Sequence, residues 1–126
     1  MAARIQHFRQ LNVYRTAFES ALRIHQISLN FPREEKYALV DQIRRSSKSV
    51  CANLGEAWQR RRYKAAFQAK IEDCKSEASE VQVWLELSLA LNYISQEEFE
   101  ALDNSYEKIL AQLIKMLINP DQWLIK

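Results

Sequence analysis

Hydrophobic residues recur every three or four positions along almost the whole chain, which is the spacing of one face of an α-helix. The pattern is interrupted at Pro32, after Arg60, at Ser95 and at Pro120. Proline disfavours helical backbone in the residue before it, and Ser95 with Glu98 has the spacing of a helix-capping box. We therefore predict helices at residues 8–29, 33–60, 62–92 and 95–118, followed by a tail at 119–126 that folds back or docks on a neighbour.

Each predicted helix has one apolar stripe that we expect to face a common core. In the first helix the stripe is Leu11, Tyr14, Phe18, Ala21, His25 and Ser28, and in the second it is Leu39 or Val40, Ile43, Ser47, Val50, Leu54 and Ala57. In the third it is Phe67, Ile71, Cys74, Ala78, Val81, Leu85 and Ser88, and in the fourth Phe99, Leu102, Tyr106, Ile109, Leu113 and Met116. Four such helices with short connections predict one all-α domain at residues 1–126, an antiparallel up-down-up-down four-helix bundle. Small residues recur every fourth position of the second helix, at Ser47, Cys51 and Gly55, and predict either close packing of another helix or a local kink there.

The third and fourth helices each carry a second apolar stripe, although a bundle helix needs only one. An exposed apolar patch of this size usually marks an interface. We therefore expect a homo-oligomer, and the alternative is that the tail and the first helix cover these faces within one chain. The predicted interface residues are Trp84, Leu87, Leu91, Leu110 and Ile114.

Composition supports the helical prediction and excludes several classes of protein. One Gly and two Pro are too few for a turn-rich β fold, and a P-loop or a Rossmann fingerprint needs at least two close glycines. Two cysteines cannot build a disulfide framework. Residues 1–8 do not have the pattern of a signal peptide, and apolar runs stay well below the roughly 18 residues of a membrane span. We expect a cytoplasmic protein.

Candidate chemistry is sparse, so we expect no enzyme, no metal and no cofactor. The two histidines, His7 and His25, lack the Glu-x-x-His spacing of a bundle metal site, and Cys51 and Cys74 have the positions of small apolar residues. Several polar residues fall near the inward sides of the second and third helices, where a structural polar network is the main interpretation and a general acid–base pair the minor one. This network consists of Gln42, Asn53, Glu56, Glu77 and Glu80.

Charge is unevenly distributed along the chain. Residues 1–75 contain 15 basic and 7 acidic residues, whereas residues 76–126 contain 3 and 9. Arginines that grip phosphates beside aromatic rings that stack on bases are typical of nucleic-acid binding. Two alternatives remain open: cations also stabilise helix C-termini, and oppositely charged helices attract one another. The predicted nucleic-acid-binding residues are Arg44, Arg45, Lys48, Arg60, Arg61, Arg62 and Lys64, among which Arg45 is the one we expect to pair with an internal carboxylate.

Several short motifs occur at fixed spacing along the chain: Phe31-Pro32-x-Glu-Glu-Lys-Tyr-x-Leu, Gln42-Ile43-Arg44-Arg45-Ser46, Ser49-Val50, Ala52-Asn53-Leu54-x-Glu56, Tyr93-Ile94-Ser95 and Met116-Leu117-Ile118. These motifs resemble those of a bacterial four-helix-bundle family, the proteins encoded in 23S rRNA intervening sequences, which includes Avd, the accessory protein of diversity-generating retroelements. The resemblance extends from Phe8 to Ile118.

The resemblance implies a ring-like homopentamer of four-helix bundles without catalytic residues. For the retroelement branch it also implies binding to RNA or a DNA/RNA hybrid and to a reverse transcriptase. Our leading hypothesis is an oligomeric, non-enzymatic nucleic-acid-binding accessory protein. The competing hypothesis is a homo-oligomeric protein–protein scaffold that binds no nucleic acid, and neither involves a membrane.

Overall fold

The computed structural model describes residues 4–125, so Met1–Ala3 of the predicted domain and Lys126 of the predicted tail lie outside the described residues. Helices and short 3-10 turns make up the regular structure of this range, and no strand occurs in it, which confirms the all-α prediction. The helices are α1 (Asn12–Ser28), α2 (Leu39–Gln59), α3 (Lys64–Ala90) and α4 (Gln96–Ile118), and the 3-10 turns are η1 (Phe8–Gln10), η2 (Arg33–Glu35) and η3 (Pro120–Gln122).

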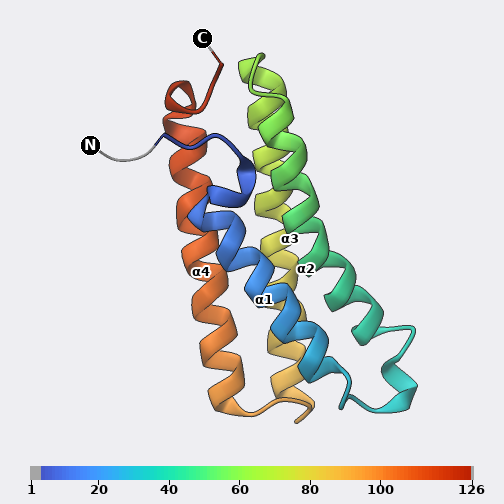
Figure 1. The fold of residues 1–126 in the computed structure, drawn as a ribbon. Coiled ribbons are helices and arrows are strands. Elements are labelled where there is room, and N and C mark those ends of the chain that lie inside the picture. Colours follow the sequence, from blue (N-terminus) through green and yellow to red (C-terminus); the bar gives the residue numbers. More distant parts are fainter. Residues whose placement is uncertain (1–3, 126) are drawn as a thin grey trace.

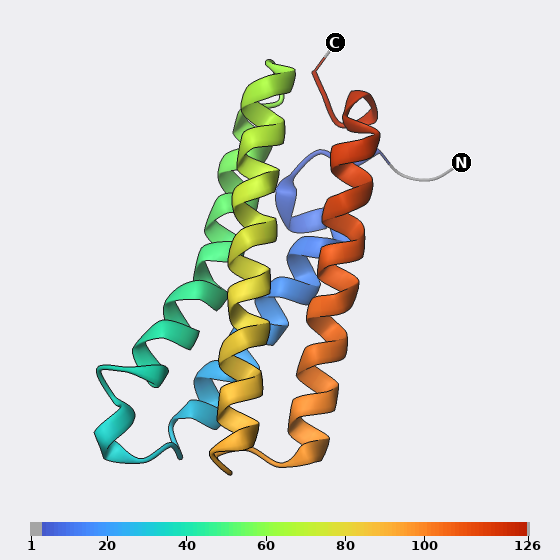
Figure 2. The same ribbon diagram turned by 180° about the vertical axis from the view of Figure 1, so that it is seen from behind.

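The four helices lie side by side along one long axis (Figures 1 and 2). The α1–α2 and α3–α4 connections lie at one end of the molecule. The α2–α3 turn, the segment before α1 and the segment after α4 lie toward the other end. This arrangement brings residues 4–10, 60–64 and 120–125, which are far apart in the sequence, to the same end.

The first predicted helix is divided in the structure. The ring of His7 accepts a hydrogen bond from the Arg9 N–H, and the Gln10 side chain accepts one from the His7 N–H, so these two residues cap η1 as a separate turn. Leu11 is extended (φ −68°, ψ 131°) and buried. The helix therefore begins at Asn12, and the prediction of one continuous helix from residue 8 was wrong.

The second helix begins six residues later than the predicted start at Arg33. The connection is instead held by its contacts with the α3–α4 turn. Phe31 is buried, and its ring centroid lies 5.3 Å from that of Tyr93. The Tyr93 hydroxyl donates to Glu35 Oε2 at 2.8 Å, and this bond raises the pKa of Tyr93. The anchored segment forms tight turns, and α2 starts only after Ala38, whose backbone is not helical (φ −123°, ψ −103°).

The predicted cap at the start of α4 is confirmed. The Glu98 N–H donates to Ser95 Oγ at 3.0 Å, and the Ser95 N–H donates to Glu98 Oε1 at 2.9 Å. Just before it, Asn92 adopts φ 64°, a left-handed conformation that asparagine tolerates better than most residues. The turn from α3 to α4 is therefore encoded locally by Asn92 and by the capping pair.

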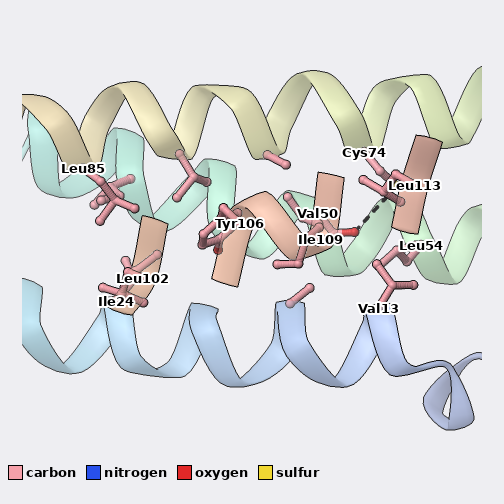
Figure 3. Close-up of a cluster of buried hydrophobic side chains, with 14 of the residues drawn as sticks. Val13, Ile24, Val50, Leu54, Cys74, Leu85, Leu102, Tyr106, Ile109 and Leu113 are labelled. Carbon is pink, nitrogen blue, oxygen red and sulfur yellow. Dashed lines mark hydrogen bonds between the residues drawn. The ribbon is translucent and has the colours of Figure 1, made fainter. Parts of the chain in front are cut away.

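The predicted core stripes of α2 and α3 are buried throughout, and that of α4 is buried from Leu102 onward with Phe99 half-buried. Figure 3 shows side chains from all four helices, with Tyr106 and Ile109 in the middle of the cluster. The Cys74 thiol donates to the Val50 carbonyl at 3.8 Å across the α2–α3 contact. The centre of the bundle is therefore mainly apolar, with a few buried serines such as Ser47 and Ser88.

The predicted core stripe of the first helix was wrong for its middle residues, although Leu11 and Ser28 at its ends are buried. Phe18 is 45% exposed, and Tyr14 and His25 are only half-buried. The true stripe consists of smaller side chains, because α1 lies close to both α2 and α4 and leaves little space for a large ring on that face. Its buried residues are Val13, Ala17, Ser20, Ile24, Ile27 and Ser28.

Candidate nucleic-acid interface

The α2–α3 turn presents cations at one end of the bundle. Arg60 follows the last residue of α2, and the Tyr63 N–H donates to its carbonyl at 3.2 Å, which makes the turn tight. Arg60, Arg62 and Tyr63 are exposed, with 66% of Tyr63 accessible. Neither Arg60 nor Arg62 has a carboxylate within 4.0 Å among the described residues. The turn therefore offers two cations and an aromatic ring to solvent.

Arg61 lies between Arg60 and Arg62 in the sequence, but its side chain contacts other residues of the protein. Its guanidinium carbon lies 3.5 Å from the centroid of the Trp58 ring, and Nε donates to the Trp58 carbonyl at 2.7 Å. Nη1 donates to the Trp123 carbonyl at 3.4 Å. Partial burial lowers the pKa of Arg61. This arginine, which was predicted to contact phosphates, is therefore held in place by contacts within the fold.

The segment before α1 adds cations that the sequence analysis missed. Arg4 lines a hollow of about 390 Å³ together with Trp58, Arg61 and Leu124. Arg9 is exposed, and its guanidinium carbon lies 5.1 Å from the centroid of the Phe8 ring. The predicted up-down-up-down topology was the signal that could have found these cations. In that topology the first helix starts at the same end as the turn between the second and third helices, so the residues before it must lie beside that turn.

Of the four remaining predicted cations, Lys64 is the first residue of α3 beside the turn, and the other three lie elsewhere on α2. Arg44 donates to Ser28 Oγ at 2.8 Å and to the His25 carbonyl at 3.5 Å, so it joins α1 to α2. Lys48 is exposed and lines a groove between α1 and α2. The 16 residues from Arg44 to Arg60 correspond to roughly 24 Å at the helical rise. The seven predicted residues therefore do not form one cluster.

The predicted polar network forms two groups along the contact between α2 and α3, each centred on a cation. Arg45 of α2 lies 3.4 Å from Glu80 and 3.8 Å from Glu77 of α3, and it donates to Gln42 at 3.2 Å. Sequence reasoning expected the network inside the bundle, but the Arg45 side chain is 53% exposed. Arg45 and Glu80 therefore lie at the solvent edge of the contact, where ion pairs contribute little stability, while Glu77 lies on its inner side.

The second group is centred on Lys70 of α3, a residue that the sequence analysis missed. Its Nζ lies 2.7 Å from Glu56 and 3.5 Å from Asn53, both on α2, and 3.6 Å from Asp73. The hydrogen bond with Lys70 lowers the pKa of Glu56 and raises the pKa of Lys70. Its spacing could have indicated this role. Lys70 lies seven residues before Glu77, and residues seven apart share one helix face, so Lys70 is expected on the same α2-facing side as Glu77.

The titratable groups in the core do not resemble catalytic groups. Burial raises the pKa of Cys51 to about 11 and that of Cys74 to about 12, so both thiols stay protonated. Desolvation raises the pKa of Glu77, whose Oε2 is buried and has no hydrogen-bond partner among residues 4–125. The described residues contain no group of three His, Cys, Asp or Glu side chains that could hold a metal ion. No helix in the described range is long and apolar enough to cross a membrane.

The predicted interface residues do not form one continuous surface: some lie toward the contact between α2 and α3, and others toward the contact between α3 and α4. Trp84 comes seven residues after Glu77, which faces Arg45, so it lies toward α2. Leu110 comes seven residues after Asp103, which accepts from Gln82 at 3.2 Å, so it lies where α4 meets α3. Trp84 and Leu110 are half-buried, while Leu87, Leu91 and Ile114 are 44%, 49% and 43% exposed.

A further apolar surface lies on α1 and was assigned to the core by the sequence analysis. Phe18 and Leu22 project from α1 beside Tyr14 and His25 and line a groove of about 410 Å³ that Cys51 and Lys48 complete on α2. Together with Val83 on α3, which is 53% exposed, these residues give the bundle apolar side chains on several sides.

Comparison with known proteins agrees with this structure. The 23S rRNA-intervening sequence protein family matches residues 9–115. A solved structure from Bacteroides thetaiotaomicron, a protein of unknown function from the S23 ribosomal protein family, is 30% identical with a TM-score of 0.74. The match covers 83% of this chain and 97% of that one. No curated protein matches the chain. The chain belongs to the 23S rRNA-intervening sequence protein family.

Proposed function

We propose that this protein is a non-enzymatic nucleic-acid-binding accessory protein, which uses the end of the bundle formed by residues 4–10 and 60–64 to bind the phosphate backbone of RNA or a DNA/RNA hybrid. The observation that supports the proposal is the pair of exposed arginines, Arg60 and Arg62, neither of which has a carboxylate within 4.0 Å among the described residues, at the end that residues 4–10 also reach. The opposite end, where the α1–α2 and α3–α4 connections lie, has a different balance, because η2 and the first turn of α4 carry four acidic residues beside Arg33 and Lys36: Glu34, Glu35, Glu97 and Glu98.

Exposed Tyr63 supports single strands as the ligand. Arginines neutralise phosphates, and an aromatic ring beside them stacks on an unpaired base of any sequence. The turn holds both kinds of side chain within four residues, from Arg60 to Tyr63. We therefore expect binding with little sequence preference and with a strong dependence on salt.

Assembly is the second part of the proposal. The antiparallel up-down-up-down bundle would present Leu87, Leu91 and Ile114 to other copies, and Phe18 and Leu22 offer a further apolar surface. A repeated interface between unlike surfaces closes into a ring when the rotation between copies permits. A ring, such as the expected homopentamer, would bring one basic end from each copy to the same side, and a reverse transcriptase is the partner we propose for it.

A salt titration of binding tests the proposal. A short single-stranded RNA of mixed sequence is titrated with the wild-type protein between roughly 50 and 200 mM salt, the range over which phosphate contacts weaken strongly. Arg60→Glu with Arg62→Glu should abolish binding. Arg33→Glu with Lys36→Glu, which changes the net charge equally at the opposite end, should leave most of it.

The scaffold hypothesis predicts a different result. It has structural support in the apolar groove between α1 and α2, which a partner helix could occupy. If the wild-type protein binds no RNA at the lowest salt, the scaffold hypothesis is favoured. If both charge-reversed variants lose binding equally, net charge and not the basic end is responsible.

A further inference from the structure

Residues Pro120–Ile125, which we name the covering segment, fold back from the end of α4 onto the α2–α3 turn (Figure 1). The Ile125 N–H donates to the Arg61 carbonyl at 3.0 Å, and Arg61 Nη1 donates to the Trp123 carbonyl at 3.4 Å. Lys64 Nζ lies 3.7 Å from Asp121 Oδ1. Two of the four cations at the turn therefore have their partners in the covering segment.

Arg61 is positioned for a stronger acceptor than a backbone carbonyl. Trp58 fixes the guanidinium by stacking and by accepting from Nε, which leaves the two terminal nitrogens for other partners. A guanidinium makes shorter and stronger hydrogen bonds to a phosphate than to a neutral oxygen, and often makes two at once. Its lowered pKa indicates a charge that is partly removed from water without a compensating anion. A phosphate oxygen would provide that compensation.

The contacts that hold the covering segment are weak individually. The Lys64 and Asp121 side chains are 56% and 82% exposed, and an ion pair as exposed as this contributes little. The segment contains only the three-residue turn η3, and the buried Trp123 Nε1 has no hydrogen-bond partner among the described residues. Pro120 is buried, and Trp123 and Leu124 are half-buried against the edge of the core, so the segment is anchored at Pro120. Residues 121–125 can open locally while Pro120 and the bundle stay in place.

We propose that the covering segment is a displaceable cover over a phosphate site formed by Arg61 and Lys64. A nucleic-acid backbone would first contact the exposed Arg60 and Arg62, and would then replace the Trp123 carbonyl and the Asp121 carboxylate with its own phosphate oxygens. This inference rests on the proposed function, because the covered site is part of the same basic end. The cover limits the affinity of the closed protein and adds two contacts when it opens.

An opened variant tests this inference. Asp121→Asn removes the partner of Lys64, and Ile125→Pro removes the N–H that bonds to Arg61, since proline has none. The matched control is Glu107→Gln, which removes one carboxylate at an exposed position of α4. Binding of a single-stranded oligouridine is measured against salt for the wild type, the opened variant and the control. Thermal unfolding verifies that all three proteins are folded.

The expected result is a change in the salt dependence. Each phosphate contact to a single strand contributes about −0.7 to the slope of log K against log salt, so the opened variant should be steeper by about 1.4 and bind about tenfold more tightly near 100 mM salt. Adding Lys64→Gln should reduce the slope by about 0.7 in the opened variant and by less in the wild type, where the Asp121 carboxylate competes with phosphate for the exposed Lys64. The control should match the wild type.

The outcomes separate this inference from the proposed function. If the wild type and the opened variant bind with equal slopes, the cover is contradicted and the proposed function stands. If Lys64→Gln weakens the wild type as much as the opened variant, the site is not covered. If only the opened variant binds, the cover is supported and the exposed arginines alone are insufficient. If neither protein binds at low salt, both proposals are wrong.

Discussion

The ring of Phe8 lies over Gly55, so that a Cβ atom at residue 55 would be 3.7 Å from Phe8 Cζ. Gly55 of α2 was predicted to allow another helix to pack closely, but it faces the ring of Phe8 in the 3-10 turn η1. This separation is an ordinary van der Waals contact, and a methyl group therefore fits without displacing the ring.

Gly55→Ala is expected to stabilise the protein. Glycine within a helix loses more conformational freedom on folding than alanine does, so the free energy of unfolding should rise by about 0.5–1 kcal/mol. Urea unfolding followed by circular dichroism measures this. A loss of stability would mean that the Phe8 ring approaches α2 more closely than described.

Tyr106→Phe is expected to be neutral or stabilising. The Tyr106 hydroxyl is buried and has no hydrogen-bond partner among the described residues, and leaving a buried polar group unpaired costs about 1–3 kcal/mol. Burial also raises the pKa of Tyr106, so the folded state retains its proton more strongly than the unfolded state does. The wild type should therefore lose more stability than the variant as the pH rises above the normal value of about 10. Destabilisation by more than about 1 kcal/mol would indicate a hydrogen bond to an internal water.

Glu77→Gln should raise stability at neutral pH by up to about 1 kcal/mol, because it removes a desolvated carboxylate that lies 3.8 Å from its partner Arg45. Desolvation raises the pKa of Glu77, so the folded state binds the proton more tightly. The wild type therefore loses stability as the pH rises from the unfolded pKa through the raised folded value, and the advantage of the variant should shrink as the pH falls to about 4.

Urea titrations at pH 7 and pH 4 measure this difference, with Glu107→Gln on the exposed side of α4 as the control. An equal effect of Glu77→Gln at both pH values would show that the carboxylate is well solvated.

Leu87→Asp with Ile114→Asp should dissociate the assembly without unfolding the bundle. Both side chains are nearly half exposed, so the substitutions remove little core packing, whereas an unpaired carboxylate in an apolar interface is strongly unfavourable. Size-exclusion chromatography with light scattering measures the mass. Tyr37→Asp, at an 85% exposed position outside the predicted interface, is the control and should leave the mass unchanged.

How far the sequence determined the fold differs between α3 and α1. The core stripe of α3 was predicted residue by residue, because charged residues occupy much of its outward surface and its second apolar stripe is confined to its C-terminal half. α1 has two stripes of equal period, and the larger side chains suggested the wrong one. Which stripe is buried depends on how closely α1 approaches its neighbours, and this is a tertiary property that local periodicity does not contain.

The candidate site shows a similar division. Periodicity placed Arg60 and Arg62 on the turn, where the structure leaves them exposed. The stacking of Arg61 on Trp58 and its contact with Trp123 depend on a tail 62 residues away in sequence. Such long-range contacts, like the pairing of Lys70 with Glu56, are set by helix register and not by local pattern.

The central claim is that apolar side chains on the outer faces bring several copies together and so combine their basic ends. Sedimentation velocity of the wild-type protein at low micromolar concentration tests it most directly. We predict one species heavier than a dimer, with the mass independent of added RNA. A folded monomer or dimer that persists over this concentration range would contradict the claim.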